Sequence, residues 1–387
     1  MKSKILIVAA EASSALYAQR LLEHWQQQGK EIEAFGVGTQ TLENLGFERL
    51  GKSEEMAVVG IQEVVSHWSI IKGSFDRLVE AARQRRPQVA LLLDYPDFNL
   101  RLAEKLKKIN IPVVYYISPQ VWAWRQGRVK QIKRFVDKML VLFPFEKEFY
   151  DKHEVPCRFV GHPLLDELET RLFDRTELDR ERLRFGVGPQ DILLGLMPGS
   201  RRSEIRHHLR TQIQTAEILI EEFSRLKVAL LVAPTLKIEE IKSELGELKI
   251  PLMTIQMPPL EMVKMMDVVL AASGTATLLV GLLEKPMNIM YRMNGMTAYL
   301  ARRFVRNTPF FGMINLILGK EVCPEFFQER ALPEILAQSL GPLVESSEER
   351  ESMAKELRKT KELLGARGAT SRVAEEIEVY FDGNRGH

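Results

Sequence analysis

The chain has 387 residues, which is long enough for two domains of ordinary size. Hydrophobic residues make up 45% of it and charged residues 27%, as is typical of a soluble globular protein with sizeable cores. The formal net charge of +2 is too small to indicate nucleic-acid binding by itself, although a basic face could still serve an anionic substrate or membrane surface.

The first half of the chain alternates short apolar runs with amphipathic stretches. We predict strands at 4–10, 31–38, 88–95, 111–118, 137–143 and 157–161, with helices between several of them at 15–28, 74–85 and 98–109. The strand runs are apolar nearly throughout, as expected of a parallel sheet covered on both faces. The first run is too short for the core of a signal peptide, so we interpret it as a strand. A Rossmann-like domain is therefore predicted over residues 1–165.

The same alternation returns in the second half, where we predict strands at 191–197, 227–233, 251–257, 267–272 and 286–291. They form a second Rossmann-like domain over 191–345. The charged segment 166–190 lacks an apolar strand and is expected to be a linker, and the charged tail 346–387 is expected to be a helical brace. We predict an α/β fold of two doubly wound domains facing a cleft, with ligands at the carboxyl ends of the strands.

The cysteines and the apolar runs bear on the compartment. Neither Cys157 nor Cys323 has a CxxC partner, so the sequence suggests no zinc site and no disulfide framework, and a reduced cytoplasm is the expected setting. No run approaches the roughly 18 apolar residues of a membrane span. Any contact with a membrane is therefore expected to be peripheral.

Residues 60–75 carry large apolar side chains at helical spacing. Such a stripe most often faces the core of the protein. A helix lying on a lipid surface would show the same pattern. In this second interpretation the lipid-facing residues include Val64, Val65, Trp68 and Ile71.

Two strand-to-helix junctions in the second half carry residues that suit an anion. The first, PGSRRSE, follows the strand at 191–197. In it Gly199 lets a ligand approach the backbone, Ser200 can donate to phosphate oxygens, and Arg201 can form a forked pair with phosphate. Either junction could be a plain turn with a helix cap, but two of them in one sheet favour a nucleotide diphosphate at positive helix ends. The second junction consists of Ser273, Gly274 and Thr275.

Further polar residues follow the later strands. Tyr291 and Arg292 close the strand at 286–291, and Asn315 and Gln328 are polar groups in apolar surroundings. They could belong to the same nucleotide site, or they could be helix caps and surface residues.

In the first half, LLLDYPDFN places acids directly after a buried strand. Pro96 ends the strand, and Asp97 could cap the helix that follows, which is the commoner role, or it could accept a proton from an attacking hydroxyl; Asn99 lies two residues further on. The next junction, SPQVWAWR, could fill a core or could bind a sugar and a phosphate. Its candidates are Ser118, Gln120, Trp122, Trp124 and Arg125, with the loop histidine His162 further along.

These motifs together closely resemble those of lipid-A-disaccharide synthases, inverting glycosyltransferases with a GT-B fold. The similarity spans about residues 3–380 and includes PDFN, SPQVWAWR, FPFEKEFYDK, VPCRFVGHP, PGSR and ASGTA in this order. The resemblance implies that the chain joins UDP-2,3-diacylglucosamine to 2,3-diacylglucosamine 1-phosphate in lipid A biosynthesis and releases UDP. It also implies a peripheral location at the inner face of the inner membrane, a homodimer, and neither a cofactor nor a metal.

The resemblance also implies roles by position. Asp97 would be the base for the acceptor hydroxyl, and Glu11 and Ser13 would lie on the acceptor side with the first-half candidates. Residues 61–75 would meet acyl chains or membrane. The donor site would comprise Gly199, Ser200, Arg201, Ser273, Gly274, Thr275, Tyr291, Arg292, Asn315 and Gln328.

The chain departs from the family pattern in two places. The usual Gly-Glu-Ala-Ser-Gly-Asp reads here AEASSA, with Ala10, Ser14 and Ala15 in place of two glycines and an acid. Leu279 stands where the family carries a Glu that can bind the ribose hydroxyls. Losing this charged hydrogen bond is expected to cost roughly 1.5–3 kcal/mol of donor binding free energy. The alternative is therefore a non-catalytic or substrate-shifted relative. A sugar-nucleotide epimerase shares the architecture but fits the tryptophan and PDFN segments poorly.

Overall fold

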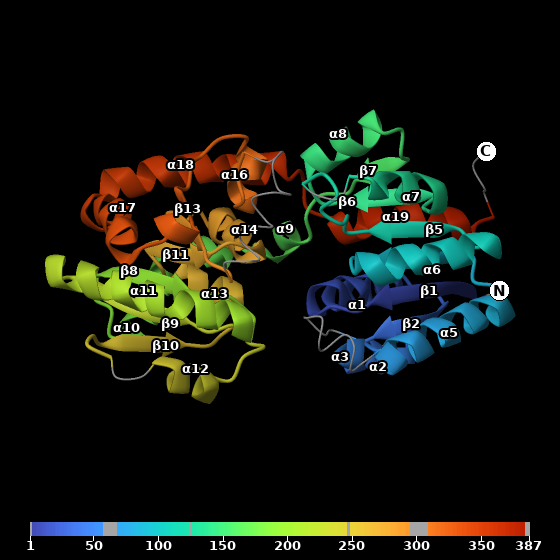
Figure 1. Cartoon of the computed structure of the whole chain (residues 1–387), viewed down its shortest axis with the longest axis horizontal. Coiled ribbons are helices and arrows are strands. Elements are labelled where there is room, and N and C mark those ends of the chain that lie inside the picture. The colour runs from blue at the N-terminus through green and yellow to red at the C-terminus, as the bar shows by residue number, and fades with distance from the viewer. Residues whose placement is uncertain (1, 57–67, 124–125, 246–247, 295–308, 384–387) are drawn as a thin grey trace. The chain divides into compact units, whose positions relative to one another are not determined.

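The computed structural model describes residues 2–56, 68–123, 126–245, 248–294 and 309–383, and it forms two compact units (Figure 1). The N-terminal unit comprises Met1–Asp166 and Leu364–His387, and the C-terminal unit comprises Glu167–Leu363. Four residues predicted to take part in function lie outside the described residues: Val64, Val65, Trp124 and Arg125.

The N-terminal unit is built on a parallel seven-stranded sheet in the order β3-β2-β1-β4-β5-β6-β7. Its strands are β1 (Ser3–Ala9), β2 (Ile32–Gly38), β3 (Glu48–Lys52), β4 (Val89–Leu93), β5 (Val113–Tyr116), β6 (Lys138–Val141) and β7 (Cys157–Phe159). In β1, Leu6 and Val8 belong to a core on one face of the sheet, and Ile5 and Ile7 to a core on the other. Both faces are covered, which explains why the central strands are apolar throughout.

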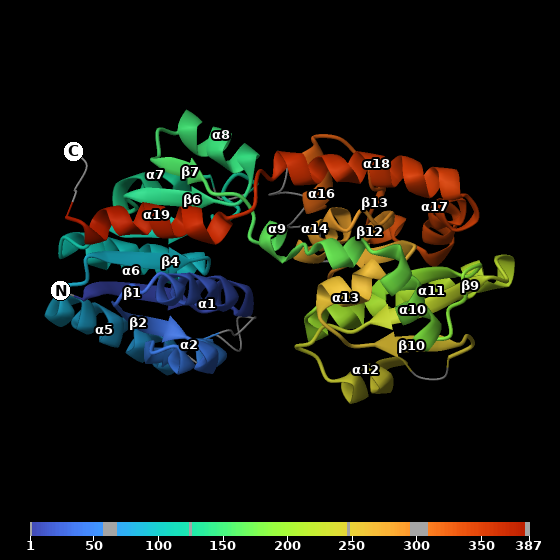
Figure 2. The same cartoon turned by 180° about the vertical axis from the view of Figure 1, so that it is seen from behind.

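Helices pack on the two faces of this sheet. One core holds buried residues of α5, α6 and α7, and the other holds residues of α1 and α19. Figure 2 shows α1 and α19 side by side, and the two helices are in contact. The helices of this unit are α1 (Ala12–Gln27), α2 (Gln40–Asn44), α3 (Ser53–Met56), α5 (Trp68–Arg85), α6 (Pro96–Lys108), α7 (Arg128–Phe135), α8 (Pro144–Lys152), α9 (Leu164–Glu167) and α19 (Ala369–Phe381).

The C-terminal unit repeats the plan with a parallel six-stranded sheet in the order β10-β9-β8-β11-β12-β13. Its strands are β8 (Ile192–Met197), β9 (Leu226–Leu231), β10 (Leu252–Ile255), β11 (Val268–Ala272), β12 (Met287–Tyr291) and β13 (Glu325–Phe327). Its helices are η1 (Thr170–Phe173), α10 (Arg175–Arg184), α11 (Arg202–Glu222), α12 (Ile238–Leu245), α13 (Pro259–Lys264), α14 (Thr275–Leu282), α16 (Met313–Leu318), η2 (Gln328–Arg330), α17 (Pro333–Glu345) and α18 (Ser347–Leu363). The prediction of two doubly wound α/β domains is confirmed.

The segment 166–190, predicted as a linker, instead folds into η1 and α10 within the C-terminal unit. Two of its charged side chains, Arg182 and Glu181, form ion pairs with the rest of the unit. Arg182 is buried, donates to the Met265 carbonyl oxygen and pairs with Asp267 at 2.8 Å. The buried ammonium of Lys264 lies 2.9 Å from Glu181, also of α10. Charge density alone therefore did not distinguish a linker from a helix with internal ion pairs.

The tail, predicted as a single brace, is divided between the two units. Helix α18 packs on α14 and α16 of the C-terminal unit. Helix α19 belongs to the N-terminal unit, where Trp25 donates its indole N–H to Glu378 at 2.9 Å and Arg158 pairs with Glu376 at 2.5 Å.

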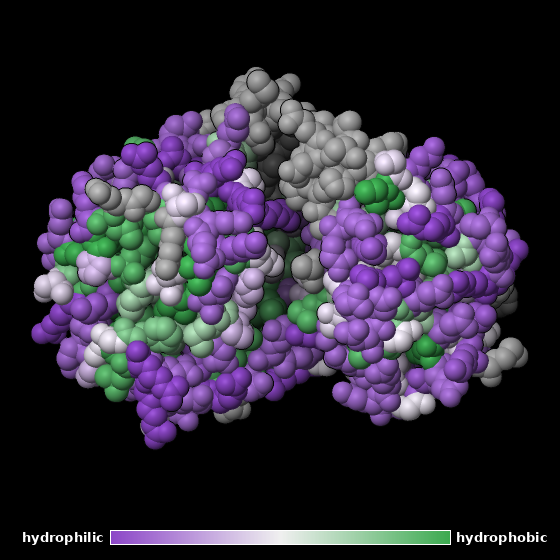
Figure 3. All heavy atoms as spheres, turned by 90° about the horizontal axis from the view of Figure 1, so that it is seen from below, coloured by the Kyte–Doolittle hydropathy of each residue, from purple (hydrophilic) through white to green (hydrophobic). Residues whose placement is uncertain are grey.

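The prediction that Ile71 faces lipid is wrong. Its side chain is buried in the core with Leu78 and Ala82 of the same helix. The apolar stripe of α5 therefore faces inward there, which is the commoner use of such a pattern. The side chain of Trp68 is not described, and neighbouring Ile70 is exposed. No helix among the described residues has the length and apolar character needed to cross a bilayer. In the face shown in Figure 3, hydrophilic residues predominate on both units and hydrophobic residues form smaller patches.

Candidate functional site

The connectivity of the C-terminal sheet creates a switch point between β8 and β11. The chain runs from β8 outward to β9 and β10, and then returns to the other side of β8 with β11, β12 and β13. Ligands of open α/β sheets bind where the strand order reverses in this way, beyond the carboxyl ends of the strands. Met197 pairs with Ala271, so the turns that follow β8 and β11 lie next to each other at this edge. These are the two junctions that the sequence predicts as the diphosphate site.

The turn after β8 is held by Glu204. Gly199 has a φ of +126°, and a Cβ there would lie 2.5 Å from the Cβ of Glu204, so only glycine fits. The amides of Ser200 and Arg201 donate to the carboxylate of Glu204 at 2.8 Å and 3.3 Å. Because these amides at the start of α11 already bind a carboxylate, the Arg201 guanidinium and Ser200 hydroxyl are the groups expected to reach an anion.

The turn after β11 is more open. Gly274 has a φ of +157°, and no heavy atom lies within 4 Å of where a Cβ would stand. The hydroxyl of Ser273 donates to the Phe311 carbonyl oxygen at 3.0 Å, and Thr275 is exposed at the start of α14. No acidic residue occupies the first turn of α14, in contrast to α11. The positive end of the α14 dipole is therefore not neutralised from within its first turn.

The other predicted donor residues make contacts within the C-terminal unit near this edge. Arg292 donates to the Thr211 hydroxyl on α11 at 2.8 Å, and half-buried Tyr291 packs its ring on His208. Gln328 donates its side-chain amide to the Met293 carbonyl oxygen. Each of these side chains joins neighbouring segments of the C-terminal unit.

Asn315 was predicted to line the donor site, but its side chain is fully buried in the interior of the C-terminal unit. Its amide nitrogen donates to the carbonyl oxygen of Cys323 at 2.7 Å and to Glu325 at 2.8 Å, and its oxygen accepts from the amides of Val322 and Cys323. Glu325 in turn accepts from the Phe311 and Gly312 amides. The polar residues that stand out in this apolar stretch thus form an internal network, as buried polar groups must.

The departure at Leu279 is accommodated in the fold. The Leu279 side chain is buried in α14, with 8% of its surface exposed. Glu284 is no substitute for the missing acid, since its carboxylate accepts from Arg358 at 2.8 Å and from Lys361 at 2.6 Å on α18.

The N-terminal sheet has its own switch point, between β1 and β4. Glu11 and Ser13 follow β1, and Asp97 follows β4, so the residues predicted for the acceptor side lie after the two strands at which the order reverses. The substitutions nearby fit without strain. The Ser14 hydroxyl accepts from the Glu11 amide at 3.0 Å and donates to the Glu11 carbonyl oxygen at 2.8 Å, and Ala15 packs in the core.

The turn that presents Asp97 is strained and well supported. Asp94 and Tyr95 have φ values of 49° and 47°, in the left-handed region that costs a non-glycine residue about 1–3 kcal/mol. The carbonyl oxygen of Asp94 accepts from Asn99 at 2.7 Å and from the Tyr115 hydroxyl at 2.5 Å. Asn99, predicted beside the cleft, is fully buried and stabilises this turn through its hydrogen bond to Asp94. The Asp97 carboxylate is 72% exposed and forms an ion pair with Arg128 of α7.

The candidates after β5 and β7 are mostly interior. Ser118 is buried, and its hydroxyl lies 2.8 Å from that of Tyr150. Trp122 is half-buried against the ring of Phe145. His162 is buried and accepts from the Leu164 amide, and burial lowers its pKa to about 3, so it stays neutral. Among the described candidates of this group, the exposed one is Gln120.

Glu146 is a residue that the sequence reasoning missed. It sits in the first turn of α8 and is buried, accepting from the Phe143 amide at 3.2 Å near Ser118 and Trp122. Burial raises the pKa of this carboxyl to about 8, so the protonated form prevails at neutral pH. An acid three residues after Phe143 and two after Pro144 predicts a helix-capping role but not its burial.

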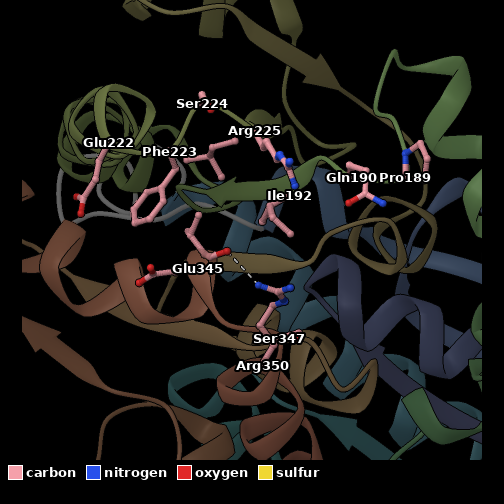
Figure 4. Close-up of a pocket in the computed structure, with 12 residues that line it drawn as sticks. Pro189, Gln190, Ile192, Glu222, Phe223, Ser224, Arg225, Glu345, Ser347 and Arg350 are labelled. Atoms are coloured by element: carbon pink, nitrogen blue, oxygen red, sulfur yellow. Dashed lines mark hydrogen bonds between the residues drawn. The ribbon is translucent and has the colours of Figure 1, made fainter.

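No group of three or more His, Cys, Asp or Glu side chains that could hold a metal ion occurs among the described residues. A pocket of about 490 Å³ lies at the amino end of β8 and β9, lined by residues such as Ile192, Arg225 and Arg350 (Figure 4). It is at the edge opposite to the switch-point turns and contains none of the predicted site residues.

The chain is similar to known proteins in both sequence and fold. A family model described as lipid-A-disaccharide synthetase matches residues 5–377. The lipid-A-disaccharide synthase of Trichlorobacter lovleyi is 37% identical over 371 residues, 96% of each chain. Among solved structures, the glycosyltransferase of kitacinnamycin matches with a TM-score of 0.66 at 16% identity, over 98% of this chain and 99% of that one. UDP-GlcNAc 2-epimerase from Neisseria meningitidis, solved bound to UDP-GlcNAc, matches with a TM-score of 0.63 at 12% identity, over 98% and 100%. The two units together therefore form the GT-B fold.

Proposed function

The chain belongs to the lipid-A-disaccharide synthase family, and we propose that its C-terminal unit holds the UDP of the donor at the β8–β11 switch point while Asp97 serves as the base. As a member, it is an inverting glycosyltransferase of lipid A biosynthesis. It condenses UDP-2,3-diacylglucosamine with 2,3-diacylglucosamine 1-phosphate to lipid A disaccharide 1-phosphate and UDP.

The observation that carries the donor proposal is the meeting of two anion-suited turns at one switch point. Arg201 offers a fork of N–H donors to a phosphate, and the start of α14 offers a positive helix end without an internal acid in its first turn. The fold relative solved with UDP-GlcNAc supports a sugar nucleotide as the ligand. Positive charge at this edge would stabilise UDP as it leaves.

On the acceptor side, the hydroxyl attacks the anomeric carbon from the face opposite to the diphosphate. As the new C–O bond forms, the bond between the anomeric carbon and the phosphate oxygen breaks, and UDP leaves with the electron pair. Asp97 takes the hydroxyl proton. Its ion pair with Arg128 and the support of its turn by Asn99 fix the carboxylate in place, which favours proton transfer by a positioned base.

We also propose that the enzyme acts peripherally at the inner face of the inner membrane, because both substrates carry acyl chains, and that it is a homodimer, as the family resemblance implies. Exposed Ile70 near the start of α5 is a side chain that would meet the lipid surface. Flotation with anionic vesicles tests membrane binding, and sedimentation velocity tests the dimer. Wild-type protein that stays in the aqueous fraction, or that sediments as a monomer, would contradict the respective statement.

The decisive experiment for the activity supplies both lipid precursors to the purified protein. The expected products are the disaccharide and an equimolar amount of UDP. An Asp97→Asn variant should lose turnover and still bind UDP. Wild-type turnover in Asp97→Asn would remove Asp97 as the base, and loss of UDP binding in that variant would show that Asp97 belongs to the donor side.

A further inference from the structure

Helix α11 presents adjacent histidines with opposite environments. His207 is exposed, whereas His208 is fully buried between two backbone segments. Nδ1 of His208 lies 2.8 Å from the Pro198 carbonyl oxygen. Nε2 lies 3.0 Å from both the backbone nitrogen and the carbonyl oxygen of Arg292. One imidazole ring therefore bridges two strand ends.

The hydrogen bonds select one form of this ring. The Arg292 amide can only donate, so Nε2 must accept and carries no hydrogen. The hydrogen of the neutral ring is then on Nδ1, which donates to the Pro198 carbonyl oxygen. Burial lowers the pKa of His208, which maintains the neutral form.

The position of the bridge connects it to the predicted donor site. Pro198 is the first residue after β8, and Arg292 is the first residue after β12. Strand β11 lies between β8 and β12 in the sheet, so the bridge passes over the strand that ends in the Ser273–Thr275 turn. The Ser273 amide donates to the Met290 carbonyl oxygen and so holds the end of β11 to β12, and His208 adds a link between the ends of β8 and β12 through two further bonds.

Neighbouring residues of α11 extend the same arrangement. Gln212, one turn later, donates to the carbonyl oxygens of Met197 in β8 and Leu270 in β11, at 3.2 Å and 3.1 Å. The Thr211 hydroxyl accepts from the Arg292 guanidinium. The buried face of α11 thus holds the ends of three adjacent strands by side-chain hydrogen bonds.

We propose that His208 is a positioning residue for the donor, which sets the distance between the Gly199–Arg201 turn and the Arg292 segment on either side of the β11–α14 turn. This inference rests on the proposed function, because it takes those turns as the diphosphate site. A ring that fixes this spacing should affect the affinity for UDP and the donor, and leave acceptor binding unaffected. A merely structural role would not produce that difference.

The test compares His208→Leu, which removes both bonds, with His207→Leu as the matched control on the exposed neighbour. Calorimetry measures the Kd for UDP, and initial rates give KM for donor and acceptor separately. We expect His208→Leu to weaken UDP binding and raise the donor KM about tenfold, which is the effect of losing about one hydrogen bond. The acceptor KM should stay within twofold of the wild-type value. His207→Leu should match wild type.

His208→Asn, which is too short to bridge both partners, serves if the Leu variant does not fold, and the same shift is expected. Wild-type Kd and donor KM in a folded His208 variant would overturn the inference, as would an acceptor KM that rises in parallel with the donor KM. An Arg201→Ala variant separates this failure from that of the donor site. If Arg201→Ala loses UDP affinity while the His208 variants keep it, only the positioning role fails. If Arg201→Ala binds as wild type, the donor site itself is misplaced.

Discussion

Replacing Glu146 by Gln should make the stability of the protein less sensitive to high pH. The folded carboxyl has a pKa of about 8 against an ordinary value of 4.5. Between these values the folded state therefore holds a proton that the unfolded state has lost. Stability falls with rising pH wherever the folded state binds more protons, so wild type is penalised progressively from about pH 4.5 to pH 8. A glutamine of the same shape carries no such penalty.

The size of the effect follows from the pKa difference. At about 1.4 kcal/mol per unit, moving from pH 5 to pH 8.5 should shift the difference in unfolding free energy between Glu146→Gln and wild type by about 4 kcal/mol, in favour of the variant. Urea unfolding at the two pH values measures this difference, and other titrating groups cancel because both proteins share them. Glu148→Gln, an exposed acid on the same helix, is the control and should show no shift. An equal difference at both pH values, or a shift that favours wild type, would refute a protonated buried Glu146.

Three substitutions test the turns at the switch points. Asp97→Asn should lower kcat by a factor of about 10²–10⁴ at an unchanged Kd for UDP, measured by product formation and calorimetry, and wild-type turnover would exclude it as the base. Gly199→Ala should weaken UDP binding, because a Cβ there would overlap Glu204; unchanged affinity would mean that the turn does not contact the ligand. Asn99→Ala should cost about 1–3 kcal/mol of stability and reduce turnover, since the strained turn at Asp94 and Tyr95 loses a hydrogen bond from below. Thermal unfolding checks the last variant, and a melting temperature equal to that of wild type would contradict it.

The sequence predicted the architecture because both sheets are parallel and covered on two faces. Continuous apolar runs such as those of β1, β4 and β11 indicate buried strands or buried helices, and their short length and regular spacing favour strands. The short strands β3 and β13 were missed. Strand β3 reads ERLGK and β13 is only three residues long, so edge pairing rather than an apolar pattern defines them.

The position of the candidate turns could be predicted from strand order, whereas the burial of individual polar side chains could not. Turns rich in Gly and Ser after strands identified the residues around Gly199 and Gly274, and the register then placed the two turns side by side. Asn315 and Asn99 look like ligand residues in the sequence, yet both are internal hydrogen-bond partners. The burial of Glu146 and of His208 could not be predicted, because only the fold removes these side chains from water.

The measurement that tests the central claim most directly is calorimetric titration of UDP into the wild-type protein and into Arg201→Ala. We expect saturable binding of one UDP per chain in the wild type. In Arg201→Ala we expect a loss of about 1.5–3 kcal/mol of binding free energy, as for a hydrogen bond to a charged group. No heat of binding in the wild type, or equal affinity in the two proteins, would contradict a donor site at the β8–β11 switch point.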